Sequence, residues 1–303
     1  MVNLGGILFP LYIYPYPATR WDPLIAAAQQ YRDVTFTAVV NPDNGPGADS
    51  TGCPNKDFVG AIAKLNAEPN IVTMGYVHTA NRWDCSGPAD SQRPGTGTDI
   101  CFASAPYATV MKNISTYGSW NTCVGWDGAQ HDVHMDSLFI DEAPGQDNFK
   151  FGAYMTNLTN FAKSNFVNAA NNGTVLFNAG AQTDSRYFNV ADTIIVLENT
   201  EQFYESIPDI DTWVWGSGTK YPSKASILLY NHTTTQGTTS TYNTVAYNVD
   251  TILSRKHDAF ASVFISNLIG NQYAEFPTDW ANITSAVNYT VTANKICVAN
   301  NTC

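Results

Sequence analysis

Charged residues are scarce in this sequence of 303 residues, and the basic ones are the scarcer kind. Lys and Arg number 15 against 26 Asp and Glu, which gives a net charge of −11. Binding to nucleic acid needs clusters of basic side chains, and the sequence has none, so we expect no nucleic-acid partner. The acidic balance suits a neutral or cationic partner, and it equally suits a secreted protein kept soluble by its charge.

Several motifs and long apolar segments are also missing. No apolar run approaches the length that spans a bilayer, so we expect no membrane partner. There is no Gly-x-Ser-x-Gly elbow and no phosphate-binding loop, and Gly95-Thr-Gly97 lacks the third glycine of a dinucleotide fingerprint. His131-x-x-His134 precedes a predicted strand without a further ligand nearby, so we predict no metal and no cofactor.

The six cysteines form no Cys-x-x-Cys pair and lie mostly in polar segments, which favours disulfides over metal binding. Six cysteines allow 15 connectivities. Local spacing favours Cys85–Cys101 and Cys297–Cys303, and Cys53–Cys123 then remains by elimination.

Glycosylation sequons agree with an oxidising compartment. The expected sites are Asn113, Asn157, Asn172, Asn231, Asn282, Asn288 and Asn300. The chain runs almost directly into Gly6–Phe9, so we expect Met1 to stand where a leader has been removed. The sequence therefore predicts a secreted, extracellular protein, associated with the cell wall, and a monomer.

Short apolar runs rich in Val, Ile, Phe and Tyr alternate with helical patterns along the whole chain. At 44% hydrophobic residues the chain can fill a sizeable core. Eight runs predict strands: 6–13, 36–41, 71–78, 138–142, 175–179, 193–198, 225–230 and 262–267. Eight strand–helix units in one chain predict an α/β fold, a closed (β/α)8 TIM barrel formed by residues 1–303 as a single catalytic domain. An open doubly wound sheet is the alternative, but its glycine fingerprint is missing after the first strand.

The helices between the strands carry recognisable start signals and apolar stripes. Trp21-Asp22-Pro23 predicts Asp22 as an N-cap before a proline at the first helical position. Helical spacing of apolar residues predicts helices over 24–31, 57–67, 107–117, 151–169, 244–258 and 277–287, with weaker signals at 184–190 and 201–206.

In a barrel the residues that end the strands gather on one face, where barrel enzymes have their active sites. Polar and aromatic residues end all eight predicted strands. The expected substrate-binding residues are Tyr12, Tyr14, Asn41, Tyr76, His78, Asn178, Tyr230 and His232, with Asn267 ending the last strand. Trp83, Trp126, Trp213 and Trp215 in neighbouring loops are candidates to stack on sugar rings.

Carboxylates end two of the buried runs. Leu138–Ile140 leads into Asp141 and Glu142, and Thr193–Leu197 leads into Glu198. Both strands are even-numbered, so their ends can approach each other across one intervening strand. Two carboxylates facing a cleft are the minimum machinery of glycoside hydrolysis. Because adjacent side chains on a strand point to opposite faces, only one of Asp141 and Glu142 is expected to face the barrel axis unless a bulge intervenes.

These motifs resemble the spherulin-4-like family, glycoside hydrolase family 135. The resemblance spans nearly the whole chain and rests on Pro10–Pro15, Asn41–Gly47, Gly75–Thr79, Phe139–Glu142 and Glu198. It departs in the long loop 81–100 and in Asn178-Ala-Gly, where Asn-Pro-Gly is expected. The resemblance implies an endo-acting hydrolase of α-1,4-linked N-acetylgalactosamine in fungal galactosaminogalactan, with Asp141, Glu142 and Glu198 as its acidic residues.

We therefore expect a polysaccharide substrate that contains galactosamine, and a retaining mechanism. Asp141 is expected to be the nucleophile, Glu198 the general acid/base, and Glu142 a residue that orients a hydroxyl group or tunes its neighbours. Two alternatives remain open: an enzyme that prefers deacetylated, cationic galactosamine, and a non-catalytic wall or spore-coat protein that binds polysaccharide.

Overall fold

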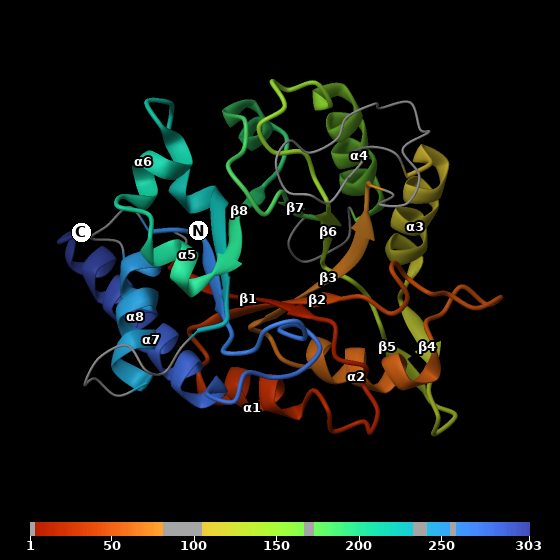
Figure 1. Cartoon of the computed structure of the whole chain (residues 1–303). Coiled ribbons are helices and arrows are strands. Elements are labelled where there is room, and N and C mark those ends of the chain that lie inside the picture. Colours follow the sequence, from red (N-terminus) through yellow and green to blue (C-terminus); the bar gives the residue numbers. More distant parts are fainter. Residues whose placement is uncertain (1–3, 81–104, 167–172, 233–240, 255–258) are drawn as a thin grey trace.

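Eight parallel strands close into a barrel with helices outside it, in the order β1-β10-β9-β8-β7-β6-β3-β2 (Figure 1). The computed structural model describes residues 4–80, 105–166, 173–232, 241–254 and 259–303. The predicted (β/α)8 barrel is thereby confirmed. The barrel strands are β1 (Gly6–Leu11), β2 (Thr35–Val40), β3 (Ile71–His78), β6 (Ser137–Asp141), β7 (Val175–Asn178), β8 (Thr193–Thr200), β9 (Ala225–Tyr230) and β10 (Ser262–Ile265).

The helices follow the barrel strands along the chain and cover the outside of the barrel. Figure 1 shows α1 and α2 on one side, α3 and α4 on another, and α7 and α8 together on a third. Their bounds are α1 (Asp22–Gln30), α2 (Lys56–Asn66), α3 (Tyr107–Ser119), α4 (Gly152–Asn165), α5 (Glu201–Glu205), α6 (Ile210–Trp215), α7 (Thr241–Leu253) and α8 (Trp280–Asn300), with 3-10 turns η1 (Ser185–Asn189) and η2 (Pro222–Lys224). Among the described helices, none is long and apolar enough to cross a membrane.

Burial on both faces explains why apolar runs marked the strands. Leu138, Phe139 and Ile140 of β6 have no exposed surface, because the barrel interior lies on one side and helices on the other. Helix α2 buries the predicted stripe of Phe58, Ile62 and Leu65 against this sheet.

One close contact fixes a helix on the sheet. A Cβ atom on Gly75 of β3 would lie 2.6 Å from a ring carbon of Tyr117 in α3. The ring therefore packs directly on the strand backbone, and the Tyr117 hydroxyl donates to the carbonyl of Val40 on β2.

The structure corrects several details of the predicted elements. Asp22 is not a cap: the helix has Trp21 in that position, without a side-chain cap, and Asp22 lies in the first turn, where it accepts from Lys64. Strand β8 continues two residues beyond Glu198, and the last helix runs to Asn300 rather than 287. A hairpin of β4 (Thr122–Val124) and β5 (Gln130–Asp132) also lies outside the barrel, and no pattern predicted it.

Two of the expected disulfides are formed. Cys53–Cys123 joins the segment before α2 to the hairpin, and Cys297–Cys303 closes the end of α8. No cysteine of the described part of the chain is free. The expected Cys85–Cys101 pair lies outside the described residues.

Candidate active site

Asp141, Asn178 and Glu198 come together at the carboxyl ends of three neighbouring strands, β6, β7 and β8. The Asn178 amide nitrogen donates to Oδ1 of Asp141 and to Oε2 of Glu198, each at 2.8 Å. Because both oxygens bond to one nitrogen, their separation is at most twice this distance, and about 5 Å if the two N–H bonds diverge at the usual amide angle. The expected approach of the two carboxylates across one strand is what the structure has.

A tyrosine hydroxyl donates to the second oxygen of each carboxylate. Tyr76 of β3 donates to Oδ2 of Asp141 at 2.7 Å, and Tyr273 donates to Oε1 of Glu198 at 2.7 Å. The pKa of Tyr273 is raised well above its usual value, chiefly by burial of the hydroxyl group and next by the negative charge of Glu198. Tyr273 therefore remains a hydrogen-bond donor at any physiological pH, and its bond fixes the orientation of Glu198.

Tyr12 completes the aromatic floor between these residues. Its ring contacts Tyr76 and Tyr273 edge-on, with centroids 5.6 and 5.7 Å away. Burial raises the pKa of Tyr12 well above its usual value, and the charges of Asp141 and Glu198 add to the effect. Among the described residues, the two acids thus have neutral hydroxyl and amide donors beside them.

A β-bulge aims the side chain of Glu198. The pairing of β8 with β9 shifts between Ile195 and Leu197, so the strand gains a residue there. The backbone of Gly180, at φ +60°, accepts from the Glu198 amide and donates to the Ile195 carbonyl. A Cβ on Gly180 would lie 3.5 Å from that of Glu198, so the loop after β7 packs closely against this carboxylate.

Glu142 turns toward the same side as its neighbour, although strand alternation predicted the opposite. Its φ of +54° places it in the left-handed region, so the chain turns sharply where β6 ends. Its carboxylate comes within 3.9 Å of Nδ1 of His78, which pairs with Asp141 across the strands. Thr79 holds the turn by donating to the backbone carbonyls of Asp141 and Glu142. Both acids can therefore face the same side because of the backbone conformation at Glu142, and not because of a bulge in β6.

Five of the eight expected binding residues gather around the carboxylates: Tyr12, Tyr76, His78, Asn178 and Tyr230. Tyr230 ends β9, and burial together with the charge of Glu198 raises the pKa of its hydroxyl. His78 donates from Nδ1 to the carbonyl of Ala80, which fixes its ring beside Tyr76.

Two of the expected residues have their hydrogen-bond partners away from the carboxylates. Asn41 accepts from the amide of Gly45 and so closes the Asn41–Gly47 loop. Tyr14 points away to α2, where its hydroxyl donates to Asp57 at 2.6 Å. Asn267 likewise bonds within its own loop, to Thr278.

The expectation for His232 is wrong, because its side chain is fully buried. Its Nδ1 lies 2.5 Å from Oε1 of Glu201, and its Nε2 lies 4.0 Å from Asp279. Its position directly after a predicted strand favours the rim, but the backbone at Asn231 turns into the left-handed region and directs His232 inward.

Tyr273 is the site residue that sequence reasoning missed. It lies in the loop after β10, beyond the strand ends on which the prediction was based. Its partner Glu198 is 75 positions earlier in the chain, so no local pattern links the two residues. An aromatic residue in a loop of the catalytic face is the signal that the sequence offers for Tyr273.

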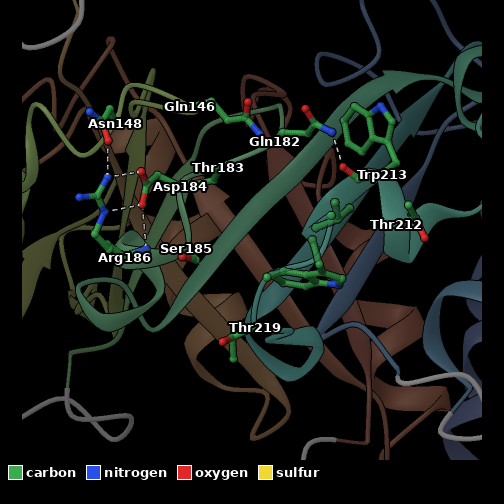
Figure 2. Close-up of a pocket in the computed structure, with 14 residues that line it drawn as sticks. Gln146, Asn148, Gln182, Thr183, Asp184, Ser185, Arg186, Thr212, Trp213 and Thr219 are labelled. Atoms are coloured by element: carbon green, nitrogen blue, oxygen red, sulfur yellow. Dashed lines mark hydrogen bonds and ion pairs between the residues drawn. The ribbon is translucent and has the colours of Figure 1, made fainter.

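A hollow of about 630 Å³ lies in the loops that follow β6, β7 and β8 (Figure 2). Figure 2 shows Trp213 facing Gln182, whose amide donates to the Trp213 carbonyl. On the opposite side Arg186 forms a two-pronged pair with Asp184 and donates to Asn148. The loops that line this hollow follow the strands that carry the acids, and two of the tryptophans proposed for stacking line it: Trp213 and the largely buried Trp215. Trp83 lies outside the described residues.

His131 and His134 do not share a metal site in the part of the chain that the structure describes. His131 bonds to Asp127, and His134 lies between Asp132 and Asp136. No cluster of three potential ligands occurs among the described residues. The pKa of His134 is raised to about 9, chiefly by its hydrogen bond with Asp136 and also by Asp132.

Comparison with known proteins identifies the family. The model of spherulation-specific family 4 matches residues 6–287. The chain belongs to this family. No curated protein matches the sequence.

Solved structures with the same fold support the barrel. Sph3 from Aspergillus clavatus, solved in complex with GalNAc, is 24% identical with a TM-score of 0.70 and covers 94% of this chain and 97% of its own. Alpha-L-fucosidase isoenzyme 2 from Paenibacillus thiaminolyticus has a TM-score of 0.55 at 10% identity, over 97% of this chain and 50% of its own. A GH18 chitinase from Pseudoalteromonas aurantia has a TM-score of 0.50 at 10% identity, over 94% of this chain and all of its own.

Proposed function

We propose that this member of spherulation-specific family 4 is a secreted glycoside hydrolase that cleaves internal α-1,4 linkages between N-acetylgalactosamine residues. The observation that carries the proposal is the bridging of Asp141 and Glu198 by the single Asn178 amide. Retaining glycosidases place their two carboxyl groups about 5–5.5 Å apart, whereas inverting ones need about 6.5–9.5 Å for a water molecule. The bridge holds the nearest oxygens close to the shorter spacing, which supports retention.

In this mechanism Glu198 first protonates the glycosidic oxygen, and Asp141 attacks the anomeric carbon from the other face. The bond to the leaving sugar breaks as an ester bond to Asp141 forms. Glu198 then takes a proton from water, which attacks the same carbon and releases the sugar from Asp141. Tyr76 and Tyr273 hold the two carboxylates in orientation during both steps, and Glu142 beside His78 is placed to orient a hydroxyl group of the substrate.

The substrate class is supported by the family and by the GalNAc bound to Sph3, a protein of the same fold. The open rim with Trp213 offers room for several sugars, which suits endo action. Two disulfides support the proposed oxidising, extracellular compartment. The acidic balance favours the alternative preference for deacetylated galactosamine, so both polymers belong in the test.

The test is release of reducing ends from purified acetylated and deacetylated galactosaminogalactan. Asp141→Asn and Glu198→Gln should each reduce turnover by about four orders of magnitude or more while folding is kept, and Glu142→Gln should reduce it less. Asn267→Ala, a change in the same rim outside the carboxylate cluster, is the matched control. A wild-type protein that binds either polymer and releases no reducing ends would identify the non-catalytic alternative, and an active Asp141→Asn variant would move the nucleophile to Glu142.

A further inference from the structure

A groove of about 820 Å³ runs along the outer side of α2, separate from the carboxylate cluster. We call it the α2 groove. Its volume lies in the range of about 300–1,000 Å³ that is usual for small-molecule sites. Its walls are Pro15, Tyr16 and Pro17 from the loop after β1, Trp126 from the hairpin, and the small residues Gly60 and Ala63 of α2.

The aromatic side chains of this groove face solvent. Trp126 is 74% exposed and Tyr16 is 70% exposed. Large exposed aromatic rings that lie together on a soluble protein mark sites of interaction. Here two of them border one groove, whose lining also includes prolines, small residues and charged side chains.

Trp126 is held in its exposed position by polar partners. Its indole N–H donates to Oδ1 of Asp57 at 2.9 Å, and the other oxygen of Asp57 accepts from Tyr14 at 2.6 Å. The Lys56 ammonium lies 5.3 Å from the centre of the indole ring. The ring is therefore oriented before any ligand arrives, which lowers the entropic cost of binding.

The hairpin that carries Trp126 is also fixed to α2, beside which it lies in Figure 1. Cys53–Cys123 ties its first strand to the segment before α2. At the other end of the helix, Asn66 donates to the carbonyl of His134. These two attachments hold the hairpin wall of the groove against α2.

Sugar rings suit this arrangement, because pyranoses present an apolar C–H face and a polar edge. Aromatic side chains combine a large apolar face with polar tips in the same way. Charged side chains border the aromatic surface, with Asp127 58% exposed and Lys64 44% exposed, so both kinds of hydrogen-bond partner are available for hydroxyl and amide groups.

The groove is connected to the catalytic site by the loop after β1. Tyr12 lies between Tyr76 and Tyr273, Tyr14 bonds to the first turn of α2, and Tyr16 lines the groove. In a barrel of this kind the helices that follow the strands begin at the catalytic face, so Asp57 and Trp126 lie toward that face. The loop after β1 therefore runs from the catalytic site to the groove.

We propose that the α2 groove is a second, non-catalytic binding site for the aminosugar polymer, with Trp126 and Tyr16 as its stacking residues. This proposal rests on the proposed function for the identity of the polymer. The site holds the chain while the carboxylate pair cleaves it, so its contribution is largest on insoluble polymer and absent on short oligosaccharides.

The first test is sedimentation with insoluble galactosaminogalactan, using full-length protein made inactive by Glu198→Gln. Adding Trp126→Ala or Tyr16→Ala should weaken binding by about tenfold each, the scale of one lost aromatic contact. Trp126→Phe keeps a ring and should retain most of the binding. Tyr289→Ala is the matched control, because Tyr289 is 72% exposed on α8 and far from α2 in sequence.

The second test uses the active protein. Trp126→Ala should hydrolyse a soluble N-acetylgalactosamine oligosaccharide with unchanged kcat/KM, and insoluble polymer several-fold more slowly than wild type. Circular dichroism melting checks that each variant is folded.

The outcomes separate this proposal from the proposed function. The groove assignment is overturned if the Glu198→Gln protein sediments with the polymer and neither the Trp126→Ala nor the Tyr16→Ala change weakens binding more than Tyr289→Ala does. It is also overturned if the Glu198→Gln protein does not sediment with the polymer. Weakened sedimentation in the Trp126 and Tyr16 variants supports it, even where wild-type protein releases no reducing ends and the proposed activity fails.

Discussion

The bridge made by Asn178 leads to the sharpest test of the site. Asn178→Ala removes the donor that Asp141 and Glu198 share in the described part of the chain, while each carboxylate keeps its tyrosine partner. The two acids then lose the contact that sets their separation. In a retaining mechanism that separation decides whether the nucleophile and the acid act on the same bond.

The magnitude follows from the two hydrogen bonds. Each joins a neutral amide to a carboxylate at 2.8 Å, and bonds of this kind contribute about 1.5–3 kcal/mol each. Part of that contribution is present before the reaction, so we expect a loss of about 3–4 kcal/mol in the transition state, or roughly 10²–10³-fold in kcat/KM. The change should fall mainly on kcat, because the amide positions reacting groups rather than remote sugars.

Stability should fall only moderately in this variant. The side-chain amide oxygen of Asn178 (Oδ1) is buried without a hydrogen-bond partner among the described residues, so its removal relieves a cost. This relief offsets only part of the two lost bonds, so we expect the free energy of unfolding to fall by about 1–3 kcal/mol, measured by urea denaturation.

The assay is steady-state reducing-end release on a soluble oligosaccharide, with Asn267→Ala as the control. Asn267 is another asparagine of the same face, and its amide bonds only to Thr278 in the described structure. The control should keep wild-type kcat/KM within about threefold. If Asn178→Ala keeps more than about a tenth of the wild-type kcat/KM while it remains folded, the bridge does not position the catalytic pair, and the reasoning fails.

Three further expectations concern stability. Gly75→Ala places a methyl group against the Tyr117 ring, so urea denaturation should show a loss of about 1–3 kcal/mol, whereas Gly60→Ala, with nothing within 4 Å, should be neutral or stabilising. The pKa of His134 is raised to about 9, so its stabilisation is complete below about pH 6.5 and lost as pH rises through 9. Since the side chain is 37% exposed, we expect His134→Gln to lose only about 1 kcal/mol at pH 6 and almost nothing above pH 9, and a difference independent of pH would contradict the assignment. Thiol titration of denatured, unreduced protein should find no free cysteine. Removing Cys53–Cys123 should lower the free energy of unfolding by about 2–4 kcal/mol. Removing Cys297–Cys303 should lower it less, because that bridge closes a sequence separation of 6 residues and Cys53–Cys123 one of 70.

The sequence by itself determined the barrel and the two catalytic candidates. Strands buried on both faces need continuous apolar runs, and helices need apolar residues on one stripe. Both patterns can be recognised in short stretches of sequence, so their alternation predicts the barrel. Asp141 and Glu198 stood out because a carboxylate directly follows each buried run. The pairing Cys297–Cys303 followed from spacing alone, since only six residues separate the two.

Only the tertiary structure decided how the side chains of the site face one another. Glu142 joined the site because its backbone adopts a positive φ, and Glu198 is aimed by a bulge that Gly180 stabilises through contacts between strands. Tyr273 lies in a loop distant in sequence and contacts Glu198, while the side chain of His232 is buried against Glu201 and not on the rim. The physical reason is the same in each case: periodicity specifies which face of an element is buried, but the partner of a polar side chain depends on backbone turns and on loops that meet only after the barrel has closed.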